Sequence, residues 1–363
     1  MSGRDEAVEL IRAGRRFLVT CHVRPDGDAL GSALGFAAIL RALDKEVVVF
    51  SRDPAPLSLQ FLPGLDGVIG RVAPTARFDA TFVMDTAARA LLPSDFPPRH
   101  VTGPVVVVDH HSAHDGFGDI HVREVDACAT GEVVIRLMHD LGIAQVPPEG
   151  AVALYTSIVT DTGGFRYRGT TAETLRIGAD LLEAGVDPWQ VAYEVFEGWP
   201  RERLKLLGSV LETLHTYADG RIALLTVRRA ALRRTGANDD MVEGLVNFAR
   251  QLRGVEIAGL VWELEPVRAG RKLVPQTKIS LRSRGNADVS HVAVALGGGG
   301  HRAAAGSTLA VGVRAAAVRL IAEAGAELVR VGLGGPRPRS VAPRARKRTR
   351  SGSARAKARA PKD

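Results

Sequence analysis

The stretch HVRPDGDALGS, residues 22–32, places a histidine and two aspartates between two apolar runs, 17–20 and 29–43. Its carboxylates, Asp26 and Asp28, are close together in one turn. Crowded carboxylates repel each other unless they are solvated or share a cation. The segment is therefore either an ordinary solvated loop or a turn that binds metal.

The apolar runs around this stretch belong to a longer alternation of short β-rich segments and helical patterns. We predict strands at 16–21, 46–50, 79–84 and 104–108, and helices at 30–43, 131–141 and 150–160. The unbroken VVVV of 105–108 indicates a strand buried on both faces. This alternation predicts an α/β fold with a doubly wound parallel sheet, in which sites form beyond the carboxyl ends of the strands.

Acidic and histidine side chains stand at the ends of four of these segments. They are His22, Asp26 and Asp28 after the first strand, Asp85 after 79–84, Asp109, His110 and His111 after 104–108, and Asp161 after the helix 150–160. One aspartate in such a place is most often a helix cap or a turn residue, but four segments that deliver polar groups to one edge indicate a shared site.

The chemistry of this set favours a pair of metal ions. Imidazole and carboxylate ligands without thiolate suit manganese, iron, cobalt or zinc better than calcium. We expect two Mn²⁺ ions, with other divalent ions as the alternative. Two such ions can activate water and neutralise a phosphoryl oxygen.

Taken together, these motifs resemble those of the DHH phosphoesterase family. The resemblance rests on HVRPDGDALGS, on Asp85, on the DHH triplet 109–111 with the FGD that follows it, and on Asp161. Downstream, GGGGHRAAAG at 297–306 resembles the signature of the DHH-associated C-terminal domain. The resemblance covers nearly all of residues 1–330, and the two-domain arrangement is most similar to the bacterial nanoRNase and pAp phosphatase branch.

The resemblance implies a role for each residue of the set. One manganese would be held by His22, Asp26 and Asp85, and the other by Asp28, Asp85, His110 and Asp161, so that Asp85 bridges the two. His111 would face the scissile phosphate, and Asp109 would orient an imidazole from behind. We do not expect His114 to be a ligand.

We predict four parts of the chain: a metal-binding DHH domain at 1–190, a linker and connecting helix at 191–216, a smaller α/β domain with a mixed sheet at 217–332, and a disordered basic tail at 333–363. Within the smaller domain we predict strands at 221–227, 255–263 and 277–282 and a helix at 239–252. The substrate cleft is expected between the two domains.

A candidate phosphate-binding loop lies in the smaller domain. Gly298, Gly299 and Gly300, followed by His301, would let backbone amides approach an anion. A helix predicted over RAAAG, 302–306, would add its positive end. The alternative is a flexible loop without a chemical role. Arg282 ends a predicted strand and could contact a phosphate with two nitrogens. By the resemblance, the terminal nucleotide of the substrate binds here.

The net charge of +8 is concentrated in the tail, because 336–363 contains eleven Lys or Arg and one Asp, while the remainder of the chain is slightly negative. This Pro-, Ser- and Arg-rich tail is either a solubilising appendage or an arm that holds longer nucleic acid. Two isolated cysteines exclude a disulfide framework, and the sequence has neither a signal segment nor a membrane-spanning run. We therefore expect a cytoplasmic protein without a membrane partner.

The function that we expect is manganese-dependent hydrolysis of short oligoribonucleotides to 5′-mononucleotides and of pAp to AMP and phosphate. Linear or cyclic dinucleotides are related candidates. One alternative is a processive single-strand nuclease that uses the basic tail. Another is a noncatalytic nucleic-acid-binding module, although such a module would be expected to lose ligand residues and none is missing here. An inorganic pyrophosphatase would not need the GGGGH loop. A homodimer through the first domain is implied by the resemblance only.

Overall fold

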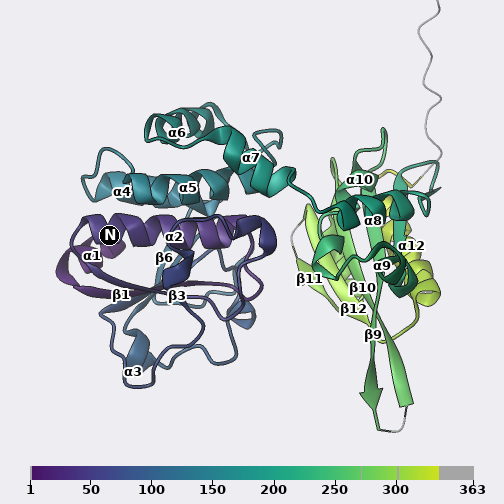
Figure 1. Cartoon of the computed structure of the whole chain (residues 1–363), viewed down its shortest axis with the longest axis horizontal. Helices are drawn as coiled ribbons and strands as arrows, with labels where there is room; N and C mark the ends of the chain where they lie inside the picture. The colour runs from purple at the N-terminus through teal and green to yellow at the C-terminus, as the bar shows by residue number, and fades with distance from the viewer. Residues whose placement is uncertain (1, 271, 301, 335–363) are drawn as a thin grey trace, which may run out of the picture. The chain divides into compact units, whose positions relative to one another are not determined.

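The computed structural model describes residues 2–270, 272–300 and 302–334, and the chain divides into two compact units, Met1–Trp199 and Pro200–Asp363 (Figure 1). Helix α7 (Pro188–Phe196) belongs to the first unit and α8 (Arg201–Leu211) to the second, so the expected connecting segment at 191–216 is divided between them. The predicted basic tail, apart from residues 333 and 334, lies outside the described residues.

A six-stranded sheet forms the centre of the first unit, with the order β3-β2-β1-β4-β5-β6. The strands are β1 (Arg16–Cys21), β2 (Glu46–Phe50), β3 (Val68–Ile69), β4 (Ala80–Met84), β5 (Val105–Asp109) and β6 (Ile120–Arg123). Every pairing between neighbours is parallel, which confirms the predicted doubly wound α/β class. The chain runs outward from β1 in one direction and from β4 in the other, so the order reverses between these two adjacent strands.

Helices cover the sheet mainly on one face (Figure 1). They are α1 (Gly3–Ala13), α2 (Gly27–Ala42), α4 (Thr130–Asp140), α5 (Pro148–Asp161) and α6 (Ala172–Glu183), with α7 following. Side chains of β1 alternate between two cores: Phe17 and Val19 face the helices, whereas Leu18 packs in a smaller cluster with Val101 of the short helix α3 (Arg99–Thr102).

Helix α2 is buried nearly all round because it lies between the sheet and α5. Gly31 permits this close approach, since a Cβ atom there would stand 2.4 Å from the carbonyl oxygen of Ala153 on α5. The tight contact fixes the N-terminal end of α2 against α5, and these are the two elements that carry Asp28 and Asp161.

The second unit is built on a mixed sheet, as predicted, with the order β11-β12-β10-β9-β8-β7. Its strands are β7 (His215–Tyr217), β8 (Ile222–Val227), β9 (Ile257–Ala269), β10 (Lys272–Ser283), β11 (Gly299–Gly300) and β12 (Ala304–Leu309), and its helices include α9 (Arg229–Thr235), α10 (Val246–Arg250), α11 (Val289–Ala295) and α12 (Val313–Arg330). Among the described strands of this second sheet, only β8 and β9 pair in parallel.

For two segments of the second unit, the predicted helix is wrong. The segment 239–252 holds only a short 3-10 turn, Asp240–Val242, and α10, because Gly244 between them takes a positive φ of 80°. The small residues after the glycine run form strand β12 instead of a helix. A Cβ atom on Gly306 would stand 2.7 Å from the carbonyl oxygen of Ile279, so a small residue is needed where β12 meets β10.

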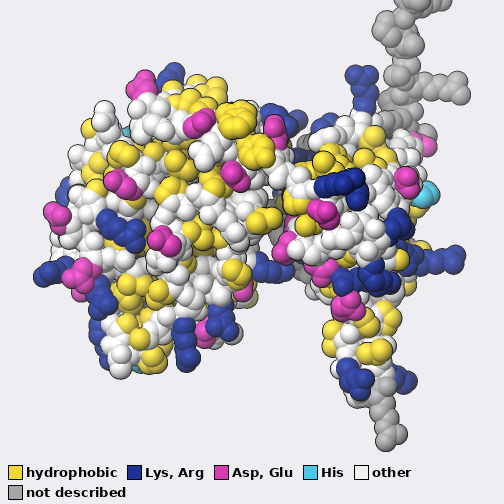
Figure 2. Space-filling model, viewed as in Figure 1, with side chains coloured by type: hydrophobic (Ala, Val, Ile, Leu, Met, Phe, Trp, Pro, Cys, Tyr) yellow, Lys and Arg dark blue, Asp and Glu magenta, His cyan; other side chains and the backbone are white. Residues whose placement is uncertain are grey.

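Exposed apolar side chains gather over α6 and α7 on the face of the first unit in Figure 2. They include Leu175, Leu182, Trp189 and Tyr193, and the rings of Trp189 and Tyr193 stack with centroids 5.5 Å apart. No helix among the described residues is long and apolar enough to cross a membrane.

Candidate metal centre

The reversal of strand order between β1 and β4 creates the site. In open α/β sheets, ligands bind beyond the carboxyl ends of the strands at the point where the order reverses. His22 directly follows β1, Asp85 directly follows β4, and Asp109 is the last residue of β5. The three strands therefore deliver these side chains to one edge of the sheet.

The turn after β1 continues into the first turn of α2. Asp26 is the N-cap of this helix, and its carboxylate accepts a hydrogen bond from the backbone N–H of Ala29 at 3.1 Å. Asp28 is only 2% exposed and points at the start of α4, where it accepts hydrogen bonds from Thr130 N at 2.8 Å and Gly131 N at 3.3 Å. Asp26 thus has an ordinary capping role in addition to its place in the cluster, whereas Asp28 is held deep inside it.

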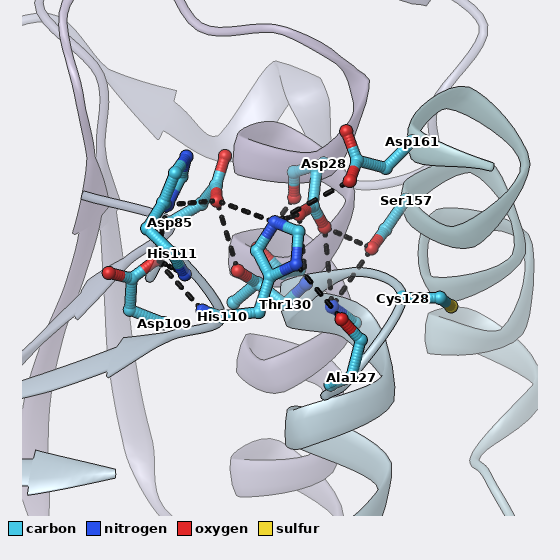
Figure 3. A network of polar contacts seen from close by, with 12 residues as sticks. Asp28, Asp85, Asp109, His110, His111, Ala127, Cys128, Thr130, Ser157 and Asp161 are labelled. Carbon is cyan, nitrogen blue, oxygen red and sulfur yellow. Dashed lines mark hydrogen bonds and ion pairs between the residues drawn. The ribbon is translucent and has the colours of Figure 1, made fainter. Parts of the chain in front are cut away.

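Two histidines are oriented in the way that metal-ligating histidines usually are. His22 Nδ1 lies 3.0 Å from the carbonyl oxygen of Val23, and His110 Nδ1 lies 3.1 Å from that of Ala127. A ring that donates its Nδ1 proton to a carbonyl keeps a lone pair on Nε2. Both Nε2 atoms face carboxylates, as Figure 3 shows for His110. His110 Nε2 lies 3.5 Å from Asp28 and 3.5 Å from Asp161.

Asp85 stands between these two histidines. Its Oδ2 lies 3.6 Å from His22 Nε2, and its Oδ1 lies 3.7 Å from His110 Nε2. The side chain is almost fully buried, and Oδ1 also accepts a hydrogen bond from the hydroxyl of Thr130 at 3.1 Å. One carboxylate therefore presents an oxygen to each half of the cluster, which is the arrangement that a bridging ligand requires.

His111 is tied to Asp109 instead of a backbone carbonyl. Its Nδ1 lies 2.5 Å from Asp109 Oδ1, which also accepts hydrogen bonds from the backbone N–H groups of His110 and His111. Arg123 at the end of β6 donates to the carbonyl oxygen of His111 and lies 3.9 Å from Asp109 Oδ2. This pairing fixes the orientation of the His111 ring at Nδ1.

Without a bound cation, the carboxylates of the cluster repel one another. Desolvation by the surrounding protein and the neighbouring charge of Asp85 raise the pKa of Asp26 and of the buried Asp28. Desolvation likewise raises the pKa of Asp161 to about 6, although the side chains of Asp26 and Asp161 remain 66% and 42% exposed. Burial would also raise the pKa of Asp85, but the hydrogen bond from His22 and the nearby histidine charges hold it below its usual range. A bound cation would relieve this repulsion.

The imidazoles respond in the opposite sense. Burial would lower the pKa of His22 and of His110, but the surrounding carboxylates outweigh burial and raise both to about 9. Protons on these rings thus occupy the place that a metal ion would take, since both a proton and a metal bind the Nε2 lone pair.

The donor set passes a simple test of fit for metal. Three overlapping groups could each hold an ion: His22 with Asp26 and Asp85, Asp28 with His110 and Asp161, and Asp85 with His110 and His111. Within each group the ligand atoms lie within 4.8 Å of one another. Ligand atoms on opposite sides of one ion are about 4.2 Å apart, at about 2.1 Å each. The structure brings all six predicted ligand residues into these groups. The third group adds His111, which the family resemblance placed against the scissile phosphate.

Other histidine and cysteine side chains lie outside these groups. His114 stacks on Phe117 with ring centroids 5.1 Å apart, and its Nδ1 accepts a hydrogen bond from Gly116 N, in keeping with the expectation that it is not a ligand. Cys21 and Cys128 are free and buried.

The predicted substrate residues lie in the second unit. Arg282 on β10 pairs with Ala304 of β12, while Gly300 on β11 pairs with Ala305 on the other side of that strand. Arg282 and the glycine run are therefore brought to the same end of β12. The expected helix after the run is absent because β12 takes its place, so that source of positive charge is lost. His301 lies outside the described residues.

Three residues that orient the cluster were missed by the sequence prediction. Ser157 on α5 and Thr130 on α4 donate to Asp28 and Asp85, and Arg123 supports the His111–Asp109 pair. Hydroxyl residues within apolar helices carry no distinctive spacing. The one available signal was the position of Ser157, one turn before the Asp161 that ends the same helix.

A parallel α/β sheet with a histidine and carboxylate cluster at its switch point is typical of a hydrolase that uses metal ions. Residues 16–158 match the model of the DHH family N-terminal domain, and residues 220–327 match that of the DHHA1 domain. A Thermus thermophilus protein named bifunctional oligoribonuclease and PAP phosphatase NrnA is 34% identical over 80% of this chain and 83% of its own length. The chain belongs to the DHH phosphoesterase family.

Other relatives extend the comparison. A Bacillus subtilis protein of the same name is 25% identical over 84% of this chain and 93% of its own length. Among solved structures, an exopolyphosphatase-related protein from Bacteroides fragilis superposes with a TM-score of 0.81 at 27% identity, covering 91% of this chain and 97% of that protein.

Proposed function

We propose that this chain is a cytoplasmic, manganese-dependent enzyme that hydrolyses short oligoribonucleotides to 5′-mononucleotides and pAp to AMP and phosphate. The observation that carries the proposal is the Asp85 carboxylate, which presents one oxygen to His22 and the other to His110 within a cluster of seven potential ligands. The names of the Thermus thermophilus and Bacillus subtilis relatives support the choice of substrates.

We propose for the cluster the ligand roles that the family resemblance implies. His22, Asp26 and Asp85 would hold one Mn²⁺, and Asp28, Asp85, His110 and Asp161 the other. When bound, two such ions would activate water and neutralise a phosphoryl oxygen. Thr130 and Ser157 would keep the carboxylates in place before substrate arrives.

His111 is proposed as the proton donor of the reaction. Hydrolysis adds water to phosphorus and breaks the bond to the leaving oxygen, which must gain a proton. Asp109 holds the ring at Nδ1, and we propose that His111 gives this proton from Nε2. Burial would lower the pKa of His111, but the Asp109 and Asp85 carboxylates outweigh burial and raise it.

We propose that the second unit binds a phosphate of the substrate. Arg282 and the exposed glycines Gly298, Gly299 and Gly300 lie at the same end of β12. The backbone N–H of Gly298 already donates to the carbonyl oxygen of Ala293 at 2.8 Å, so the amides of Gly299 and Gly300 and the Arg282 guanidinium would make the contact with the phosphate. An enzyme that holds a terminal phosphate in this way would favour substrates of one or a few nucleotides. Linear and cyclic dinucleotides belong to the same size class.

The test is a chromatographic assay of pAp, a diribonucleotide, a five-nucleotide RNA and a long single-stranded DNA, each with and without Mn²⁺. Turnover of the short substrates only with Mn²⁺ is expected. Preferred degradation of the long strand would instead establish a processive nuclease. No turnover of any substrate would leave a noncatalytic binding module.

A further inference from the structure

A pocket of about 370 Å³ lies between α5 and α7 of the first unit, apart from the metal cluster. Its walls include Tyr155 of α5, Phe165 and Arg166 from the turn after α5, and Phe196 at the end of α7. The rings of Tyr155 and Phe165 are 6.0 Å apart, and the Arg166 guanidinium lies 6.0 Å from the centroid of Phe196. The pocket is therefore lined by aromatic faces, with one cation, Arg166, and one carboxylate, Glu197.

Tyr155 brings an unused polar group to this pocket. The residue as a whole is only 6% exposed, but its hydroxyl is not among the fully enclosed polar atoms, and it has no hydrogen-bond partner among the described residues. The hydroxyl can therefore donate to or accept from a molecule that enters the pocket. Burial raises the pKa of Tyr155, so its hydroxyl keeps its proton near neutral pH.

The protein holds the Arg166 side chain through Nε and through the face of its guanidinium. Its Nε donates to the carbonyl oxygen of Gly163, and its guanidinium lies over Phe196. Its two terminal nitrogens have no partner within the described part of the chain. A guanidinium fixed at Nε, with both terminal nitrogens remaining, suits a planar two-nitrogen contact with a phosphate.

The pocket adjoins the metal cluster through α5. Asp161 is the last residue of α5, and the backbone N–H of Arg166 donates to the carbonyl oxygen of Thr162 at 3.0 Å, so Arg166 lies one turn beyond Asp161. Tyr155 lies six residues before Asp161, about 9 Å along the helix axis at 1.5 Å per residue. The pocket and the metal cluster therefore share one helix, α5.

We propose that the α5–α7 pocket is a nucleobase subsite, in which the base of a substrate nucleotide packs against Phe165 and Phe196, the Tyr155 hydroxyl bonds to its edge, and Arg166 pairs with a phosphate of the same nucleotide. This inference rests on the proposed function and adds a second place of nucleotide recognition, within the first unit. Stacking on an aromatic side chain accepts any base, whereas the Tyr155 hydroxyl selects for an edge that can form a hydrogen bond.

The test measures binding and turnover separately in the full-length chain with Mn²⁺. Calorimetric titration uses AMP and ribose 5-phosphate, which differ by the base. Tyr155→Phe is expected to weaken AMP binding about fivefold and to leave ribose 5-phosphate unchanged. Arg166→Gln is expected to weaken both about tenfold. Each variant should raise the KM for pAp in proportion, with kcat little changed.

Controls separate the subsite from folding and from the proposed function. Arg176→Gln, an exposed arginine on α6, should match the wild type. Tyr155→Phe removes a hydroxyl without a described protein partner, so loss of AMP affinity at unchanged melting temperature supports the subsite. Unchanged AMP affinity in both variants, in a chain that hydrolyses pAp, overturns the subsite alone. A chain that turns over no nucleotide but binds AMP through Tyr155 and Arg166 overturns the proposed function and supports the subsite.

Discussion

Asp85 adopts a backbone conformation that few residue types tolerate. Its φ is 51°, in the left-handed region, although it is not a glycine. Such a conformation costs about 1–3 kcal/mol and persists where the surroundings impose it, often at functional sites. Here the backbone N–H of Asp85 donates to Val108 O at 2.9 Å, and the side chain is fixed by Thr130. The strained turn aims the carboxylate between His22 and His110.

Replacing Asp85 by asparagine removes the negative charge and keeps nearly the same side-chain shape. Asn is among the few residues that accept the left-handed region, so Asp85→Asn should keep the fold. Because the carboxylate is proposed to bridge two ions, the loss should lower kcat/KM by at least about 10³-fold. The measurement is pAp turnover across a Mn²⁺ titration, with the exposed Asp66→Asn as the matched control. Full Mn²⁺-dependent activity in Asp85→Asn would show that the bridging role is wrong.

At the scale of elements, the start of β1 depends on one carboxylate. Asp79, just before β4, accepts hydrogen bonds from Arg15 N at 2.7 Å and Arg16 N at 2.8 Å, and these bonds lower its pKa. A carboxyl group with a folded pKa below its unfolded value stabilises the fold above the unfolded pKa of about 3.9. That contribution disappears as pH falls through the folded pKa.

Asp79→Asn tests this pH dependence. Since the carboxylate is exposed, we expect a loss of only about 0.5 kcal/mol in the free energy of unfolding at pH 7. The difference between wild type and variant should shrink as the pH is lowered from 5 towards 3. Urea denaturation of both proteins at several pH values measures it, and a difference that stayed constant through this range would rule out the carboxylate as the cause.

The glycine run 297–300 of the second unit packs against β12 and is also proposed to contact the substrate. A Cβ atom on Gly298 would stand 2.1 Å from Gly306 O, and one on Gly300 would stand 2.5 Å from Ala305 Cα, so both glycines are required by their approach to β12. Gly299 has no atom within 4 Å of such a Cβ position. It is therefore the position at which the role in binding can be separated from packing.

We expect Gly299→Ala to retain the stability of the wild type but to raise the KM for pAp about fivefold, because a methyl group would keep a phosphate from the backbone amides. Steady-state kinetics and thermal melting measure the two effects. Gly312→Ala, which also has open space around the added carbon, is the matched control. An unchanged KM in Gly299→Ala would leave the run with a packing role only.

At the scale of the whole molecule, the sequence predicted the elements whose patterns are unambiguous. Continuous apolar runs defined β1, β4 and β5, and the polar residues after these strands and at the end of α5 predicted the six clustered side chains. Local patterns failed to predict secondary structure where tertiary contacts determine it. The small residues of 302–306 are compatible with a helix or a strand, and only pairing with β10 selects the strand. The positive φ of Asp85 and the hydrogen bond from Ser157 depend in the same way on distant partners. The role of the cluster as metal ligand stays a prediction.

The division into two compact units makes that role testable without an activity assay. The clustered carboxylates lie in the first unit, so removal of divalent ions should destabilise that unit alone. An ion present at about 100 times its dissociation constant stabilises the folded state by about 2.7 kcal/mol. With EDTA, hydrogen exchange should accelerate at the amides of β1, β4 and α2, while those of β8, β9 and β10 keep their protection. Re-addition of Mn²⁺ should restore the first set. Equal loss in both units would indicate general destabilisation, and no change in either would show that the cluster holds no ion that stabilises the fold.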